Sequence, residues 1–189
     1  EDGKALTTGA TTAPSVAFGS SINVGRATNG GTPMTVLLAV QAPLPATVDK
    51  PLVDLNNGSG ISIGMALAAL DASAQTATLR GTWANAAWGT PRAQVNALAG
   101  SGVVYVAFST CVDGSTPSAV GVVDMAAGTV AWTPLSGLTG GGINVTQLHL
   151  GNFFNASSGG LNYTLKGLAI YAGRPADDEM LNAVQELAA

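Results

Sequence analysis

The chain has 189 residues, of which 47% are hydrophobic and 10% are charged, and its formal net charge at pH 7 is −4. This length suits one domain with a substantial core, and the absence of a basic run excludes recognition of a nucleic-acid backbone, which needs clustered Lys and Arg. The single cysteine, Cys111, excludes an internal disulfide and a cysteine-based zinc site. No apolar run reaches the roughly 18 residues that membrane insertion requires.

Short apolar runs alternate with turn residues at a spacing of about ten residues, which is typical of a sandwich or jelly roll. Residues 1–14 are predicted to form a polar arm or linker, and residues 15–189 a single β-sandwich domain. Residues 34–42 (MTVLLAVQA) are apolar without alternation, which predicts a strand buried on both faces. The other predicted strands are 15–24, the meander 52–54, 62–69 and 76–79, the hairpin 103–112 and 119–125, then 128–132, a short strand ending at Leu150, and 163–171.

The chain closes with a predicted amphipathic helix. Asp177 is the candidate N-cap, and two further acids then occupy the first turn, where the helix dipole favours negative charge. An apolar stripe at helical spacing follows, made of Met180, Leu181, Val184 and Leu187. The acidic triplet therefore has a structural explanation and indicates neither a metal site nor a catalytic site.

The closing segment, from Gln147 to Ala189, resembles a known superfamily. A strand ends in Leu150-Gly151, a polar loop follows, and a strand with the ending Gly-Leu-Ala-Ile-Tyr leads into an acidic turn and a short helix. This order is similar to the end of laminin G-like domains of the concanavalin A-like lectin/glucanase superfamily. The phrase VVYVAFST at 103–110, followed by Asp113-Gly114, adds a second point of resemblance. The resemblance implies a concanavalin A-like jelly-roll sandwich of two antiparallel sheets. The alternative fold is a viral jelly roll of different strand order, against which the closing helix argues.

Enzymatic activity is not expected. Glycosidases of the superfamily use paired carboxylates, usually as Glu-x-Asp-x-Glu on one strand, where alternate residues face the same side. This chain has no such phrase, its Glu residues lie in the terminal segments, and its Asp residues are isolated, mostly beside turns. A glycoside hydrolase or lyase therefore remains a minor alternative.

Two loops carry the candidate glycan-binding residues. Trp83 and Trp88 flank Asn85 between Gly and Pro residues, so that rings for the C–H face of a sugar accompany an amide for its hydroxyls. The second loop, 152–162, is rich in amides and aromatic rings; its candidates are Asn152, Phe153 and Asn155. The competing interpretation is that Trp83, Phe153 and Phe154 cap the core. Trp132 is assigned to the core.

A calcium ion is an open alternative, because many members of the superfamily hold Ca²⁺ at the rim and Ca²⁺ takes six to eight oxygen ligands. Asn57 and Asp113 are the candidate ligands, and Asn56 and Asn155 could also contribute oxygen atoms. No cluster of acids accompanies them in the sequence. No other cofactor is predicted.

Two functions remain in view. The first is a non-catalytic, lectin-like domain of a phage virion fibre or spike, or of a bacterial surface protein, that binds a cell-surface polysaccharide or glycan in adhesion. The second is a structural virion decoration or assembly protein without a ligand. Low charge leaves little repulsion between copies, so a homo-oligomer or contact with neighbouring virion or appendage proteins is expected, at an extracellular or virion-surface location.

Overall fold

The computed structural model describes residues 6–7, 15–24, 31–42, 50–58, 62–71, 76–83, 92–96, 102–110, 118–134, 143–151 and 163–188. Its elements, in chain order, are β1 (Leu6–Thr7), β2 (Ser15–Val24), β3 (Met34–Ala42), β4 (Lys50–Asn56), β5 (Ser62–Asp71), β6 (Thr76–Trp83), β7 (Arg92–Asn96), β8 (Gly102–Ser109), β9 (Ala119–Asp124), β10 (Thr129–Pro134), β11 (Ile143–Leu150), β12 (Thr164–Ala172) and α1 (Asp177–Ala188). For β5, β6 and β7 the description covers the backbone and its register.

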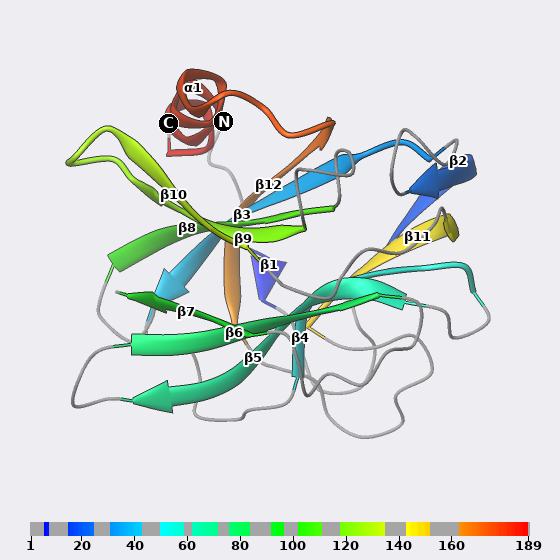
Figure 1. Ribbon diagram of the computed structural model, residues 1–189, viewed down its shortest axis with the longest axis horizontal. Coiled ribbons are helices and arrows are strands. Elements are labelled where there is room, and N and C mark those ends of the chain that lie inside the picture. Colours follow the sequence, from blue (N-terminus) through cyan, green and yellow to red (C-terminus); the bar gives the residue numbers. More distant parts are fainter. Residues whose placement is uncertain are drawn as a thin grey trace.

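The strands form two six-stranded sheets in which all neighbours are antiparallel (Figure 1). Sheet A has the order β1-β12-β3-β8-β9-β10, and sheet B has the order β2-β11-β4-β5-β6-β7. The last two strands of the chain therefore lie between early strands, one in each sheet. This arrangement confirms the predicted sandwich of two antiparallel sheets with one short C-terminal helix, including the β4-β5-β6 meander and the β8-β9 hairpin.

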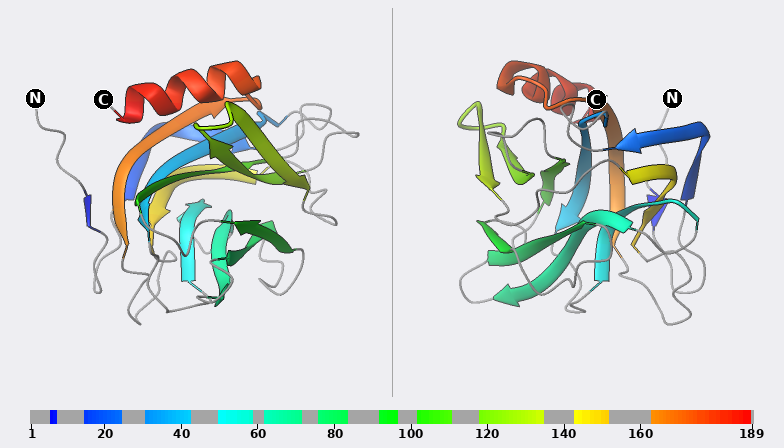
Figure 2. Two further views of the ribbon diagram at one scale, coloured as in Figure 1. Left: turned by 90° about the vertical axis from the view of Figure 1, so that its left-hand side faces the viewer. Right: turned by 45° about the vertical axis from the view of Figure 1, so that its right-hand side comes forward.

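The main core lies between the two sheets, and a second apolar cluster lies between sheet A and α1. Figure 2 shows α1 lying across sheet A, with sheet B on the opposite side. Strand β3 supplies both clusters: Val36, Leu38 and Val40 point into the main core, whereas Leu37 points toward the helix. Because successive strand residues face opposite sides, a strand covered on both sides reads as a continuous apolar run. The predicted burial on both faces is confirmed for residues 34–40, whereas Gln41 is partly exposed.

The helix packs through Met180, Ala183 and Val184, which are buried in the second cluster; Leu181 and Leu187 pack against its edge. Leu187 lies directly over Gly167 of β12, where an added Cβ would come within 2.8 Å of the leucine Cδ2. The predicted apolar stripe is confirmed. Within the described ranges, no helix combines the length and apolar character that crossing a membrane requires.

The predicted N-cap is wrong by one residue. The amide of Met180 donates to the carbonyl of Ala176 (3.0 Å), which makes Ala176 the N-cap and places Asp177 in the first turn. The Glu179 carboxylate accepts a hydrogen bond from the Ala176 amide at 2.9 Å, which is half of a capping box. The acids therefore stabilise the start of the helix, as expected, but Glu179 does so in place of Asp177.

The structure contains two edge strands, β1 and β7, that the sequence did not predict. Leu6 and Thr7, within the predicted arm, pair with Leu165 and Thr164 at the edge of sheet A. Strand β7, which the sequence pattern does not predict, forms the edge of sheet B beside β6. Its sequence, RAQVN, is short and mostly polar, so it lacks the apolar run on which the other predictions rest.

Candidate functional site

The outer face of sheet B, which points away from the core, carries a row of polar residues on its central strands. In β4, Val53 and Leu55 belong to the main core, so Asp54 and Asn56 lie on the opposite face. Both are nonetheless fully buried. Burial of a carboxylate and an amide is costly unless hydrogen bonds compensate for the lost water, so these two residues need a defined surrounding.

Strand β11 continues this polar face. Leu148 and Leu150 point into the main core, which leaves Gln147 and His149 on the outer face, each half-buried. The register places His149 opposite Asp54 and Gln147 opposite Asn56. Four polar residues from two strands that are about 90 positions apart in the chain thus form one block across the middle of sheet B.

Hydrogen bonds within β4 and its turn fix this polar block. Asn56 Nδ2 donates to Asp54 Oδ2 at 3.2 Å, and the amide of Gly58 donates to Asn56 Oδ1 at 2.9 Å. Gly58 has a φ of 76°, and a Cβ there would lie 3.3 Å from Gln147 Nε2. A side chain at Gly58 would therefore be strained by its backbone and would press on Gln147. The two residues of β4 in the polar block are thus held in place by the protein itself.

The His149 imidazole is neutral at physiological pH. Burial lowers the pKa of His149 below its ordinary value, and the charge of Asp54 opposes this effect only in part. A neutral imidazole offers one donor and one acceptor. Together with the Gln147 amide, it places neutral donor and acceptor groups on this face of sheet B.

This lowered pKa predicts a pH-dependent stability. The unfolded chain takes up a proton at His149 below about pH 6.5, before the folded chain does, so the free energy of unfolding should fall as the pH drops through that value. In urea unfolding at pH 7.5, 6.5 and 5.5, the His149→Gln variant should lose less stability than the wild type between the first and last pH. Equal losses in the two proteins would contradict the prediction.

The backbone register extends the outer face across the rest of sheet B. Asp54 lies opposite Gly64 of β5, and Gly64 opposite Thr82 of β6. Two residues along the same strands, Ala66 lies opposite Arg80. The backbone of this face therefore continues from β4 through β5 to β6.

The two residues that flank segment 152–162, which carries three predicted ligand residues, both donate a hydrogen bond to the same carbonyl oxygen of β4. The amide of Gly151 donates to the Leu52 carbonyl at 3.2 Å, and the Tyr163 hydroxyl donates to that carbonyl at 2.7 Å. Burial raises the pKa of Tyr163, so its hydroxyl stays a donor over the whole physiological range. Both ends of the segment are thus attached two residues from Asp54.

Most of the predicted ligand residues lie outside the part of the chain that the structure describes. Asn152, Phe153 and Asn155 belong to this group, as do Asn85 and Trp88. The backbone of Trp83 is described: it ends β6 opposite Ile63, which in turn lies opposite the buried Leu55. The roles of all six residues stay predictions.

The calcium prediction also stays open. Asn57 is half-buried in the turn after β4, and Asp113 lies outside the described residues. Among the residues that the structure does describe, no group of three or more His, Cys, Asp and Glu side chains could hold a metal ion. The carboxylate of Asp124 accepts hydrogen bonds from the amides of Ala126 and Ala127 at 2.9 and 3.0 Å in the β9–β10 turn. This turn belongs to sheet A, whereas Asp54 belongs to sheet B.

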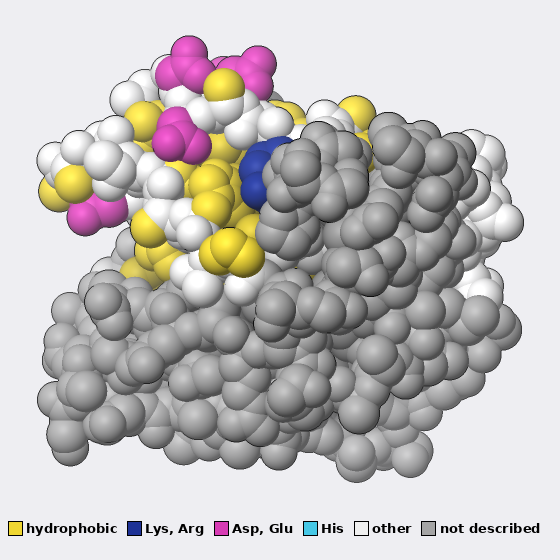
Figure 3. All heavy atoms as spheres, in the orientation of Figure 1, with side chains coloured by type: hydrophobic (Ala, Val, Ile, Leu, Met, Phe, Trp, Pro, Cys, Tyr) yellow, Lys and Arg dark blue, Asp and Glu magenta, His cyan; other side chains and the backbone are white. Residues whose placement is uncertain are grey.

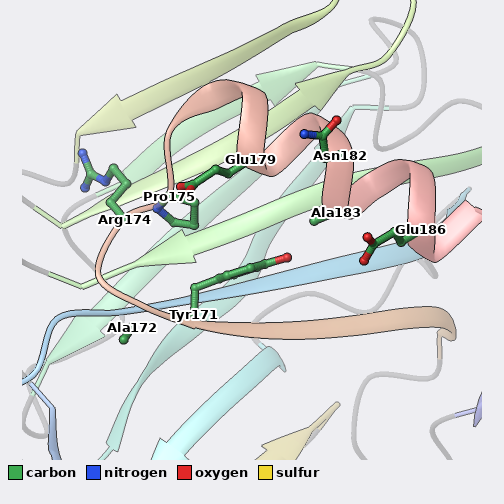
Figure 4. Close-up of a pocket in the computed structure, with 8 residues that line it drawn as sticks. All are labelled: Tyr171, Ala172, Arg174, Pro175, Glu179, Asn182, Ala183 and Glu186. Atoms are coloured by element: carbon green, nitrogen blue, oxygen red, sulfur yellow. The ribbon is translucent and has the colours of Figure 1, made fainter.

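A second hollow lies between α1 and the end of β12. This open groove of about 440 Å³ is lined by Tyr171, Arg174, Glu179, Asn182 and Glu186, among others (Figure 4). Burial, Glu186 and Glu179 all raise the pKa of Tyr171, so its hydroxyl stays protonated. In Figure 3, acidic side chains lie over α1, and hydrophobic side chains fill the space between the helix and the β9–β10 hairpin.

Two polar groups of this groove, those of Glu179 and Arg174, hold the helix and the turn before it. Glu179 caps α1, and Arg174 donates from Nε to Ser109 Oγ at 3.0 Å while its guanidinium lies 4.7 Å from the centroid of the Trp132 ring. Trp132 packs against the second cluster and over Gly121, where a Cβ would lie 2.8 Å from the ring. Its assignment to packing is confirmed. The outer face of sheet B is therefore the stronger candidate site.

Sequence reasoning missed Gln147 and His149 as site residues and treated Asp54 as isolated. The sequence does predict which way these side chains face. Val-Asp-Leu-Asn at 53–56 and Gln-Leu-His-Leu at 147–150 both alternate between apolar and polar residues, so their polar residues lie on the face away from the core. The pairing of the two strands carries no local signal, so their proximity follows from the tertiary structure alone.

Comparisons with known proteins agree on the fold. No protein-family model and no curated protein matches the sequence. Among solved structures, the CBM40 module of the Ruminococcus gnavus IT-sialidase bound to α2,3-sialyllactose is similar, with a TM-score of 0.51 and 13% identity over 94% of this chain and 99% of that chain. The Trypanosoma rangeli sialidase in complex with 2,3-difluorosialic acid is similar with a TM-score of 0.55 and 13% identity over 97% of this chain. The matched part is 28% of the sialidase chain. At these identities, the likeness shows a shared β-sandwich fold.

Proposed function

We propose that this chain is a non-catalytic carbohydrate-binding domain that holds a glycan on the outer face of sheet B. The observation that carries the proposal is the polar block on that face. Asp54 and Asn56 are fully buried and hydrogen-bonded to each other, and the half-exposed Gln147 and His149 lie beside them. A protein that needed this face only for packing would have apolar residues at these positions.

The chemistry of the polar block suits a sugar. Sugar hydroxyls both donate and accept, and the Gln147 amide does the same beside the neutral His149 imidazole. Asp54 acts as a positioning residue in this proposal, since it is buried, accepts a hydrogen bond from Asn56 and lies opposite His149. A rigid site of this kind loses little conformational entropy when the ligand binds.

The two predicted loops complete the proposed site. The segment that carries Asn152, Phe153 and Asn155 is attached at both ends to Leu52 of β4, beside the polar block. Trp88 follows β6, a strand of the same sheet. Aromatic rings from these loops would supply the apolar surface that the polar block lacks.

Similar solved structures support a glycan as the ligand. The CBM40 module, which matches this chain over nearly the full length of both, is bound to α2,3-sialyllactose. The resemblance of the closing segment to laminin G-like domains points in the same direction. We place the domain, residues 15–189, in the concanavalin A-like superfamily. Its parent protein would be a phage fibre or spike, or a bacterial surface protein, located outside the cell or on the virion surface. There the domain would form a homo-oligomer or contact other virion or appendage proteins.

The non-catalytic part of the proposal is supported by two acids of the described strands, Asp54 and Asp124. Asp54 is engaged by Asn56 inside sheet B, and Asp124 holds a turn of sheet A, so these two carboxylates do not flank a common space. Hydrolysis with the usual pair needs two carboxyl groups on either side of one glycosidic bond, separated by about 5–10 Å.

A glycan and bacterial-polysaccharide binding screen on the purified chain, with and without Ca²⁺, tests the proposal. The Trp88→Ala and Gln147→Ala variants should each weaken binding at least about tenfold, which is the effect of losing one interface contact of roughly 1.4 kcal/mol. Trp132→Phe is the matched aromatic control, because Trp132 packs on sheet A beside Arg174. Its affinity should equal that of the wild type.

Failure of the wild type to bind any glycan, host capsules included, would overturn the proposal and favour the structural assembly role. Equal binding by the wild type and both test variants would place the site elsewhere on the molecule. Binding that occurs only in the presence of Ca²⁺ would show that a calcium ion takes part in the site.

A further inference from the structure

The open groove between α1 and β12 has one wall on each element. Glu179, Asn182 and Glu186 line it from the helix, and successive members of this set are three and four positions apart. These spacings place side chains on one side of an α-helix. Tyr171 lines the groove from β12, and Figure 4 shows its ring lying along the groove with the hydroxyl toward Glu186. The volume of about 440 Å³ falls within the range of roughly 300–1,000 Å³ that small-molecule sites occupy.

The groove carries negative charge. Glu179 and Glu186 are both exposed to solvent, and Figure 3 shows acidic side chains gathered over α1. Burial is the largest cause that raises the pKa of Tyr171, and these two carboxylates are the others, so both lie near enough to act on its hydroxyl. Among the described lining residues Arg174 is the only cation, and its guanidinium lies 4.7 Å from the centroid of the Trp132 ring. The groove therefore favours a positively charged ligand.

Helix stability explains Glu179 but not Glu186. Glu179 lies in the first turn, where the helix dipole favours negative charge, and it accepts a hydrogen bond from the Ala176 amide. Glu186 lies in the last turn, where the dipole disfavours a carboxylate, and no basic residue accompanies it there. Its charge therefore destabilises the helix, and a cation bound in the groove would offset that effect.

We propose that the groove binds an amino sugar, whose protonated amine is held by Glu186 and whose ring lies on Tyr171. Hydrogen bonds between an ammonium group and a carboxylate are shorter and stronger than those between neutral groups. The face of tyrosine accepts the C–H side of a sugar ring and also attracts the cation. The Asn182 amide both donates and accepts, which suits the neighbouring hydroxyls. This site lies at α1, which crosses sheet A with sheet B on the opposite side, so the inference does not rest on the proposed function.

A lysine side chain would bring the same ammonium group on a different scaffold. It has no hydroxyls for Asn182 and no ring for the face of Tyr171, so these two residues would add little to its recognition. An amino sugar uses both of them as well as Glu186 and is therefore the better fit to this groove.

Isothermal titration calorimetry with three matched probes tests the proposal. The β1,4-linked trimer of glucosamine carries free amines, and its N-acetylated form has the same rings without the charge. A trilysine peptide with blocked ends carries three ammonium groups without a sugar. The wild type should bind the glucosamine trimer at least about tenfold more tightly than either of the other two probes.

Three variants of α1 locate the contact. Glu186→Gln removes the charge but keeps the shape, and it should weaken binding of the glucosamine trimer at least about tenfold. Its free energy of unfolding should be equal to that of the wild type or higher, because a carboxylate is lost from the last turn of the helix. Asn182→Ala, at another exposed position of the groove, should also weaken binding. Asp178→Asn removes the same charge from an exposed position outside the groove and should bind like the wild type.

A preference for the free amine that Glu186→Gln removes and Asp178→Asn retains supports the proposal. Equal affinity for the N-acetylated trimer, or no binding of any probe, overturns it and leaves the proposed function to its own screen. Equal or tighter binding of trilysine overturns the sugar assignment. Loss of binding in Gln147→Ala together with full binding in Glu186→Gln would place the amino sugar on the outer face of sheet B, which overturns this site and supports the proposed function.

Discussion

Replacement of Phe108 with alanine should lower the free energy of unfolding by about 3–5 kcal/mol, the usual cost of removing a large ring from a packed core. Phe108 lies in β8 with no solvent exposure and is among the largest fully buried side chains of the described part of the chain. It contributes to the main core between the two sheets. The cavity that alanine leaves cannot collapse easily, because strands on both sides hold the sheets in register.

Thermal and urea unfolding measure this effect. For a domain of this size, the melting temperature should fall by roughly 10 °C, since each kcal/mol corresponds to about 2–4 °C. Val103→Ala, on the same strand but 39% exposed, is the control and should change the stability by less than about 0.5 kcal/mol. A loss below 1 kcal/mol in Phe108→Ala would mean that the two sheets do not pack as the structure shows.

Replacement of Val184 with aspartate should release α1 from sheet A and cost about 3–5 kcal/mol. Val184 is fully buried among Leu37, Ala107 and Met180. An unpaired carboxylate in this cluster would have to stay buried at high cost, take up a proton, or pull the helix into water. The third response is the least costly, because a terminal helix can leave without breaking any strand pairing.

Limited proteolysis together with urea unfolding tests this prediction. The Val184→Asp variant should be cleaved within α1 at protease concentrations that leave the wild type intact, and its free energy of unfolding should be lower. Gln185→Asp places the same charge on the neighbouring exposed position of the helix and should behave like the wild type. Equal protease resistance in both variants would show that the helix does not depend on the second cluster.

Local sequence patterns determined the elements of this protein, because each depends on residues close together in the chain. The unbroken apolar run at 34–42 requires cover on both sides, and β3 has the main core on one side and α1 on the other. The helical stripe that includes Met180 and Val184 was evident from its spacing alone. The missed strand, β7, is the one whose short polar sequence gives no such pattern.

The start of the helix shows where local reasoning stops. Asp177 has the residue type of an N-cap, yet Ala176 occupies that position. The preceding turn is fixed by contacts with β3 and the residue before it: the amide of Gly173 donates to the Pro33 carbonyl at 2.6 Å, and Thr35 Oγ1 donates to the Gly173 carbonyl at 2.7 Å. These distant contacts set where the chain can first turn into a helix.

The candidate site was decided by tertiary structure. The alternation around Asp54 and that around His149 each indicate a strand with one polar face, but only the pairing of β4 with β11 brings the two together. Strand pairing depends on which apolar faces pack together across the whole chain, and a local pattern does not encode that choice. The sequence therefore determined the strands, the closing helix and the class of fold, whereas the tertiary structure decided which polar residues share a face.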